Sequence, residues 1–200
     1  MADFYFERAL FLIGNQNTGK STQLRHLFQD VRFHNDGHVL ASTDARNLKD
    51  MYRISNERVL YLRLTSPYEV GETLEEFLDK TEDKIRRSLN LGSRWNFAGP
   101  LQPTAENKMP SAADAITAFI HRFKPERVRA MFLNPDRHGN CHHSAFLCGE
   151  TDKLWTAGAE VATVDARRRC RFQLNRRLSH FRVRFFQLNR GLNRLSSEKS

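Results

Sequence analysis

The chain has 200 residues, of which 40% are hydrophobic, which is enough for one domain with a buried core. Its longest apolar runs are far shorter than the roughly 20 residues of a membrane-spanning helix, and Asp3 and Glu7 stand where a secretory signal peptide would carry basic residues. Three cysteines, an odd number, argue against a framework of disulfide bonds. We therefore expect a soluble, cytoplasmic protein without a transmembrane segment.

The net charge of +9 is concentrated at one end of the chain. Residues 166–200 hold ten Arg and one Lys against one Glu, a net charge of +10, whereas residues 1–165 hold 21 basic and 22 acidic side chains. This asymmetry predicts a nearly neutral domain over residues 1–165, followed by an Arg-rich C-terminal extension over residues 166–200.

An apolar run, a loop of small polar residues and an amphipathic segment follow one another near the N-terminus. Ala9–Ile13 is typical of a strand that is buried on both faces. Residues 14–21 then read G-N-Q-N-T-G-K-S, which fits the pattern G-x-x-x-x-G-K-[ST] at every fixed position. The segment after this loop has the apolar spacing of one helical face, at Leu24, Leu27, Phe28 and Val31. The order of strand, loop and helix is the one that a phosphate-binding loop requires.

Each fixed residue of this loop has a physical reason for its identity. Gly14 and Gly19 permit backbone angles and a close approach that a Cβ would prevent, so that successive N–H groups can turn toward a phosphate. A helix that begins near Lys20 adds free N–H groups and the positive end of its dipole. The Lys20 ammonium would reach the β- and γ-phosphates of a nucleotide, and the Ser21 hydroxyl would ligate Mg²⁺.

Through Gly14, Gly19, Lys20 and Ser21 in this setting, the sequence resembles the P-loop NTPases. The resemblance covers about the first 30 residues. It implies binding of Mg-ATP, coupled to phosphoryl transfer as in a kinase or to hydrolysis, with Lys20 as a catalytic residue. The residues expected to hold the nucleotide are Gly14, Asn15, Gln16, Asn17, Thr18, Gly19, Lys20, Ser21 and Thr22.

Strand and helix patterns alternate along the rest of the chain. Strands are expected over residues 37–43, 58–66, 127–136 and 159–165, and helices over residues 69–90, 112–123 and 144–156. Residues 90–111, which are rich in Gly, Pro and Asn, are expected to form a loop. Strands separated by helices predict an α/β fold, in which a mainly parallel β-sheet is flanked by helices in a three-layer α/β/α arrangement.

Carboxylates that follow strands are the candidates for catalysis and metal binding, because ligands bind at the carboxyl ends of the strands in such sheets. Asp44, Asp136 and Asp165 each follow a predicted strand. A P-loop enzyme needs an acidic group near Ser21 to hold Mg²⁺ and often another to orient the attacking group. We rank Asp136 and Asp44 above Asp165 as catalytic residues and expect Ser21 and Asp136 at the metal. The alternative is that these aspartates cap helices or close turns.

The middle of the chain favours a phosphotransferase. Arg94 stands in the loop expected over residues 90–111, where it could close over the nucleotide and stabilise charge on the transferred phosphoryl group. GTP is the less favoured nucleotide. Asp136–Gly139 matches the D-x-x-G sequence of GTPases, but no N-K-x-D sequence follows it to read guanine.

The C-terminal extension contains a short repeat, in which RFQLNRRL at residues 171–178 is echoed by RFFQLNRGL at residues 184–192. One interpretation is an arm that binds nucleic acid or an acidic partner, with Phe side chains stacking on bases. A second is an amphipathic helix that docks on a partner or on an anionic membrane surface, and a third is a stretch without a selected role. The alternative function is accordingly a nucleotide-regulated nucleic-acid-binding or GTPase-like switch module with little turnover.

Overall fold

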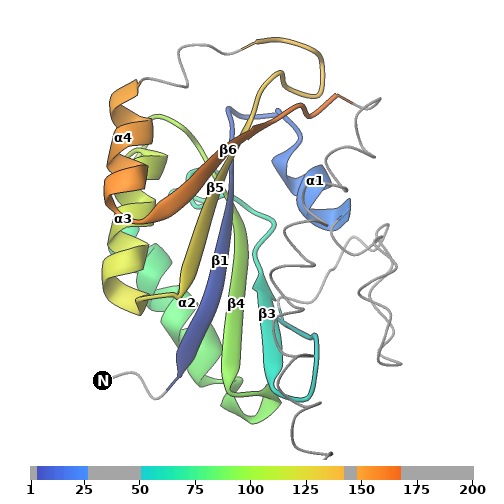
Figure 1. The fold of residues 1–200 in the computed structure, drawn as a ribbon, viewed down its shortest axis with the longest axis vertical. Helices are drawn as coiled ribbons and strands as arrows, with labels where there is room; N and C mark the ends of the chain where they lie inside the picture. Colours follow the sequence, from blue (N-terminus) through green and yellow to red (C-terminus); the bar gives the residue numbers. More distant parts are fainter. Residues whose placement is uncertain (1–3, 27–50, 142–147, 168–200) are drawn as a thin grey trace, which may run out of the picture.

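A computed structural model describes residues 4–26, 51–141 and 148–167, which form an α/β fold with a six-stranded sheet and helices on both of its faces (Figure 1). The strands are β1 (Tyr5–Ile13), β2 (Met51–Arg53), β3 (Arg58–Leu62), β4 (Arg94–Leu101), β5 (Arg127–Leu133) and β6 (Ala159–Val164). The helices are α1 (Lys20–His26), α2 (Leu74–Arg86), α3 (Ala112–Phe123) and α4 (Cys148–Thr156), with a 3₁₀ turn, η3 (Leu89–Leu91), after α2. The expected α/β architecture is confirmed.

The strand order is β2-β3-β4-β1-β5-β6, so that β1 occupies the middle of the sheet. The strands β3, β4, β1, β5 and β6 are parallel to their neighbours, whereas β2 pairs antiparallel to β3. Ile13, the last residue of β1, is paired with Leu101 of β4 on one side and with Phe132 of β5 on the other. The segments that follow β1, β4 and β5 therefore leave the sheet side by side at one edge.

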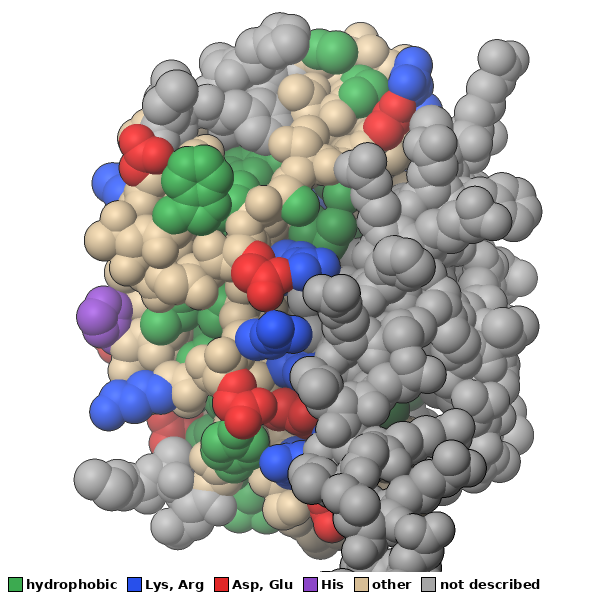
Figure 2. Space-filling view, in the orientation of Figure 1, with side chains coloured by type: hydrophobic (Ala, Val, Ile, Leu, Met, Phe, Trp, Pro, Cys, Tyr) green, Lys and Arg blue, Asp and Glu red, His purple; other side chains and the backbone are tan. Residues whose placement is uncertain are grey.

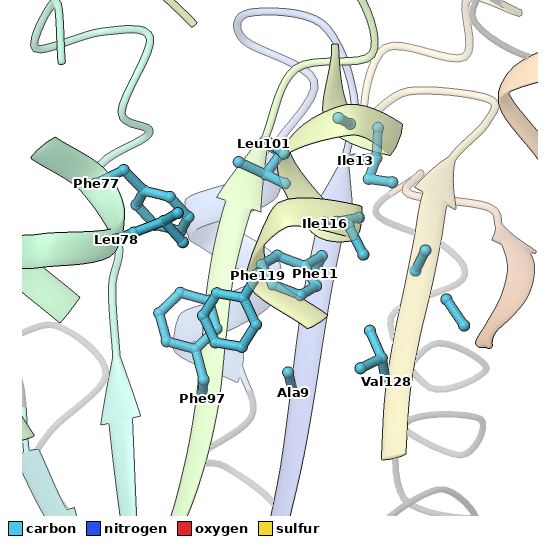
Figure 3. Close-up of a cluster of buried hydrophobic side chains, with 14 of the residues drawn as sticks. Ala9, Phe11, Ile13, Phe77, Leu78, Phe97, Leu101, Ile116, Phe119 and Val128 are labelled. Carbon is cyan, nitrogen blue, oxygen red and sulfur yellow. The ribbon is translucent and has the colours of Figure 1, made fainter. Parts of the chain in front are cut away.

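Alternate side chains of β1 build two hydrophobic cores, one on each face of the sheet. Phe11 packs against Phe97 of β4 and Phe119 of α3, with ring centroids 5.3 and 5.2 Å apart (Figure 3). Leu10 and Leu12 point to the opposite face, where they belong to the same cluster as Leu24 of α1. The helices α2, α3 and α4 cover the first face and α1 lies on the second (Figure 1).

Local capping residues decide where two of the helices begin. Thr73 and Glu76 form a capping box at the start of α2, which explains why this helix begins at Leu74 and not at the expected residue 69. Ser111 accepts a hydrogen bond from the backbone N–H of Asp114 at the start of α3, and this helix has the predicted bounds. Within the described ranges, none of the helices is long and apolar enough to cross a membrane.

The expectation of a loop over residues 90–111 is wrong, because β4 lies within it as a central strand. The carbonyl of Ala98 accepts a hydrogen bond from Arg63 N–H, so the backbone polar groups of Ala98 point toward β3. Because the direction repeats every two residues along a strand, those of Pro100 point the same way. Since β3 ends at Leu62, the missing N–H of Pro100 faces no strand of the described sheet. Gly99 is required by packing, since a Cβ there would lie 2.7 Å from Cζ of Phe97.

Candidate phosphate-binding site

Residues 14–19 connect β1 to α1 at the carboxyl edge of the sheet. The N–H of Gly14 donates to the Leu101 carbonyl over 3.2 Å, which continues the pairing of β1 with β4 into the loop. A Cβ at Gly14 would lie 2.6 Å from Oγ1 of Thr18, and Asn17 and Gly19 have positive φ angles of 61° and 98°. The loop is therefore curled closely on itself, and its first residue has no room for a side chain.

The side chain of Lys20 is folded back over this loop. Its ammonium donates to the carbonyls of Gly14 and Asn15 over 2.6 and 2.7 Å, and only 5% of the residue is exposed. Burial lowers the pKa of Lys20 from 10.5 to about 8, and the negative charges of Glu69 and Glu106 oppose this shift. The ammonium thus lies within the curled loop in an environment that destabilises its charge.

The remaining residues of the loop differ in their exposure. Gln16 and Asn17 are exposed at the tip, while the buried Thr18 donates its hydroxyl to the Asn15 carbonyl over 2.8 Å. The first helical hydrogen bond of α1 runs from Gln23 N–H to the Gly19 carbonyl. The N–H groups of Lys20, Ser21 and Thr22 therefore precede the intrahelical ladder of α1, and the last two residues are half-buried.

The Ser21 hydroxyl, which is expected to ligate Mg²⁺, donates to the Leu64 carbonyl over 2.9 Å. Leu64 lies just after β3, so this hydrogen bond ties the start of α1 to the segment between β3 and α2. Because this hydrogen bond uses the proton of the hydroxyl, the lone pairs of the Ser21 oxygen remain available to a metal ion.

Asp136 follows β5, next to the loop, but its carboxylate closes a turn. Its Oδ1 accepts from the N–H groups of His138 and Asn140 over 2.8 and 2.9 Å, and its Oδ2 accepts from the Asn140 amide over 3.2 Å. The residue is 5% exposed. The carboxylate therefore closes the turn over residues 136–140, as in the alternative given above, and its role at a metal ion stays a prediction.

Arg94, expected to close over the nucleotide, lies far from the loop. It is the first residue of β4 and pairs with Tyr5, at the amino end of β1. The eight residues of β4 separate it from the carboxyl edge of the sheet, where residues 14–19 lie, by about 23 Å, at about 3.3 Å per residue. Its guanidinium lies 5.8 Å from the ring centroid of Tyr5. The structure therefore does not bring Arg94 to the loop, and the expected lid over residues 90–111 is not formed.

The other candidates fall at different places. Asp165 follows β6, which is separated from β1 by β5, and its carboxylate bonds to the Arg167 guanidinium. Asp44 lies outside the described residues, as do the expected strand over residues 37–43, the end of the expected helix after the loop, and residues 168–200 of the Arg-rich extension.

Two carboxylates that the sequence did not single out act on the loop. Glu69 follows β3 and Glu106 follows β4, and both act electrostatically on Lys20. Their segments are joined, because the Tyr68 hydroxyl donates to the Pro110 carbonyl over 2.5 Å and the Asn107 amide donates to the Tyr68 carbonyl over 3.1 Å. Both glutamates follow strands, and this position could have marked them as candidates. For Glu106 it did not, because residues 90–111 were expected to form a loop and β4 was not predicted. Among the described residues, no three His, Cys, Asp or Glu side chains are grouped to hold a metal ion.

The loop occupies the place in the sheet where connections diverge. The connection after β1 enters α1 on one face, whereas those after the neighbouring strands β4 and β5 lead to α3 and α4 on the other face (Figure 1). In open α/β sheets, a crevice forms at the carboxyl ends of strands at such a switch point, and ligands bind there.

No protein-family model, curated protein or solved structure matches this chain. The geometry of the loop and its surroundings is therefore the basis for a functional proposal.

Proposed function

We propose that residues 14–22 bind the phosphate groups of Mg-ATP and that the protein transfers the γ-phosphoryl group to an acceptor, as a kinase does, or to water. The observation that carries this proposal is the buried Lys20 ammonium inside a curled loop at a switch point of the sheet. Burial disfavours its positive charge, so an oxyanion beside it would regain the lost stabilisation. A nucleotide phosphate is an anion whose oxygens would also accept hydrogen bonds from the N–H groups at the start of α1.

The chain offers oxygen ligands for a hydrated magnesium ion. Mg²⁺ keeps several waters and is commonly held by one or two carboxylates together with substrate phosphates. The Ser21 hydroxyl lies at the start of α1, and Glu69 and Glu106 are close enough to affect the charge of Lys20. We assign Ser21 as a direct ligand and these two glutamates as acceptors of hydrogen bonds from metal-bound waters. Bound Mg²⁺ would neutralise charge on the phosphates.

The contribution of the protein to phosphoryl transfer would be positioning and charge stabilisation. The backbone N–H groups of Lys20 and Ser21 hold the phosphates at the start of α1, and the Lys20 ammonium stabilises negative charge that develops on the β- and γ-phosphates. The products would be ADP and either a phosphorylated acceptor or inorganic phosphate.

Calorimetric titration of the full chain with Mg-ATP and with Mg-GTP, followed by an assay for released phosphate, tests the proposal. We expect ATP to bind, and we expect Lys20→Met to abolish this binding while the protein stays folded by circular dichroism. Lys153→Met removes an exposed lysine that is bonded to Glu150 and Asp114 and serves as the matched control.

The outcomes separate the alternatives. Binding of ATP with slow release of phosphate supports a kinase that awaits its acceptor. A preference for GTP with little turnover favours the switch module instead. A folded wild-type chain that binds neither nucleotide refutes the proposal, and so does a Lys20→Met variant that binds ATP as tightly as the wild type.

A further inference from the structure

Arg137 lies against the phosphate-binding loop from the side of β5. A Cβ at Gly19 would lie 3.4, 3.5 and 3.8 Å from Cβ, Cδ and Cγ of Arg137, so the aliphatic part of Arg137 runs alongside the last glycine of the loop. The N–H of Arg137 also donates to the Thr18 carbonyl over 3.3 Å. Both the backbone and the side chain of Arg137 are therefore positioned by the loop itself.

The segment that carries Arg137 is held by three neighbours. The Asp136 carboxylate closes the turn over residues 136–140. The N–H of Asn134 donates to the carbonyl of Val164 in β6 over 2.9 Å, and the N–H of Ala166 donates to the Pro135 carbonyl over 3.0 Å. Arg137 is thus carried by a turn whose backbone is hydrogen-bonded within itself and to the end of β6.

The charge of Arg137 has no carboxylate partner within the described part of the chain. Its Nε donates to Nε2 of the neighbouring His138 over 2.9 Å. Other arginines are neutralised locally: Arg63 pairs with Glu72, and Arg129 pairs with Glu160. Figure 2 shows the same pattern on one face of the molecule, where basic side chains lie beside acidic ones. An exposed guanidinium without a neighbouring acid, beside a loop that carries a buried ammonium, is suited to bind a second part of one anion.

We infer that Arg137 is a further ligand-binding residue of this site and that its guanidinium binds a phosphate group of the nucleotide. This inference rests on the proposed function, because it assigns the side chain to the same ligand. The stem of Arg137 stays beside Gly19 while the guanidinium exchanges its hydrogen bond to His138 for one to a phosphate oxygen. Lys20 and Arg137 then hold the polyphosphate from within the loop and from its β5 side.

The test uses Arg137→Gln and Arg137→Lys in the full chain, with Mg-ATP and magnesium tripolyphosphate as probes in calorimetric titration. Tripolyphosphate carries the phosphates without the base or the sugar. Both variants keep the backbone N–H that bonds to Thr18 and part of the stem over Gly19. Arg53→Gln is the matched control, since Arg53 is exposed near the amino end of β3 and donates to the carbonyls of Ser55 and Asn56.

We expect Arg137→Gln to lower the affinity for both probes about tenfold, because a hydrogen bond between two charged groups is lost. Arg137→Lys should recover part of the affinity, and Arg53→Gln should leave both affinities unchanged. Weaker ATP binding with unchanged tripolyphosphate binding would overturn the inference and assign Arg137 to the base or the sugar. Unchanged binding of both probes would overturn it while the proposed function stands, whereas a wild-type chain that binds neither probe would overturn both.

Discussion

The Ser21 hydroxyl donates a hydrogen bond to the Leu64 carbonyl over 2.9 Å and thereby joins residues that are 43 positions apart in the chain. Ser21 lies in the first turn of α1, and Leu64 lies just after β3, in the segment that leads to Glu69 and α2. The same hydroxyl is the one proposed to ligate magnesium. One side chain could therefore serve both roles, because its proton goes to the Leu64 carbonyl and its lone pairs remain for a metal ion.

Ser21→Ala should release the segment after β3 in the absence of nucleotide. We expect faster amide hydrogen exchange in residues 64–72 and a loss of about 1 kcal/mol in the free energy of unfolding, the usual net value of one hydrogen bond. Hydrogen exchange with mass spectrometry and urea denaturation measure the two effects. Ser88→Ala is the control, because the Ser88 side chain forms no capping hydrogen bond. Unchanged exchange in residues 64–72 would show that Ser21 does not hold this segment.

The lowered pKa of Lys20 predicts how the free energy of unfolding depends on pH. Its pKa is about 8 in the folded chain and 10.5 in its ordinary state, so the unfolded chain binds this proton more tightly. The free energy of unfolding should therefore gain a contribution as the pH rises from about 8 to about 10.5, with an upper limit of about 3 kcal/mol. Urea denaturation at several pH values measures this slope. Lys20→Met should remove the contribution, and an identical slope in this variant would contradict the prediction.

The same pKa predicts that nucleotide binding takes up protons. Near pH 8 about half of the Lys20 side chains are neutral, and a phosphate group beside them would raise the pKa and favour the charged form. The binding enthalpy of Mg-ATP at pH 8 should then differ between buffers with different ionisation enthalpies, which calorimetry detects. The buffer dependence should decrease at pH 6.5, where Lys20 is already protonated. Equal enthalpies in all buffers at pH 8 would speak against an involvement of Lys20.

Substitutions of Asp136 distinguish a turn-closing carboxylate from a metal ligand. Asp136→Asn keeps an oxygen that can accept from the N–H groups of His138 and Asn140, so affinity for Mg-ATP should stay within about threefold of the wild type. Asp136→Ala leaves these donors without an acceptor and should lower the free energy of unfolding by about 1–3 kcal/mol. Calorimetry and thermal denaturation are the measurements. A hundredfold loss of Mg²⁺-dependent affinity in Asp136→Asn would support the metal-ligand interpretation instead.

Gly99→Ala tests the central position of β4. The added Cβ would lie 2.7 Å from Cζ of Phe97, a buried ring in the core, so we expect a destabilisation of about 1–3 kcal/mol through overpacking. Thermal denaturation measures this change. Gly149→Ala in α4 is the matched control, because a Cβ there meets no atom within 4 Å and Ala favours a helix. Equal melting temperatures for Gly99→Ala and the wild type would argue against this packing.

The elements that the sequence predicted well are those whose determinants are contiguous. Residues 14–21 must combine two glycines, a lysine and a serine at fixed spacing between an apolar run and a helix, so the pattern can be seen without any knowledge of the sheet. The bounds of α3 also follow from local signals, namely the Ser111 cap and an apolar face.

Other features depend on neighbours that are distant in sequence, and only the tertiary structure decided them. Pro100 and Gly99 are typical of loops, yet both lie in a central strand. Pro100 is tolerated because β3 ends at Leu62, and Gly99 leaves room for the ring of Phe97. The register of β4 against β1 puts Arg94 at the edge of the sheet opposite the loop, whatever its charge would suggest.

The residues of the candidate site can also be divided into those that the sequence predicted and those that only the tertiary structure brought together. The sequence by itself determined the pattern of glycine, lysine and serine in the loop after β1, because backbone geometry at consecutive residues requires particular side chains. The tertiary structure decided that Asp136 closes a turn, that Glu69 and Glu106 act on Lys20, and that Arg137 lies against Gly19. These relationships arise where the four parallel strands β3, β4, β1 and β5 end at one edge of the sheet. The strand order sets these neighbours, and no local sequence pattern predicts it.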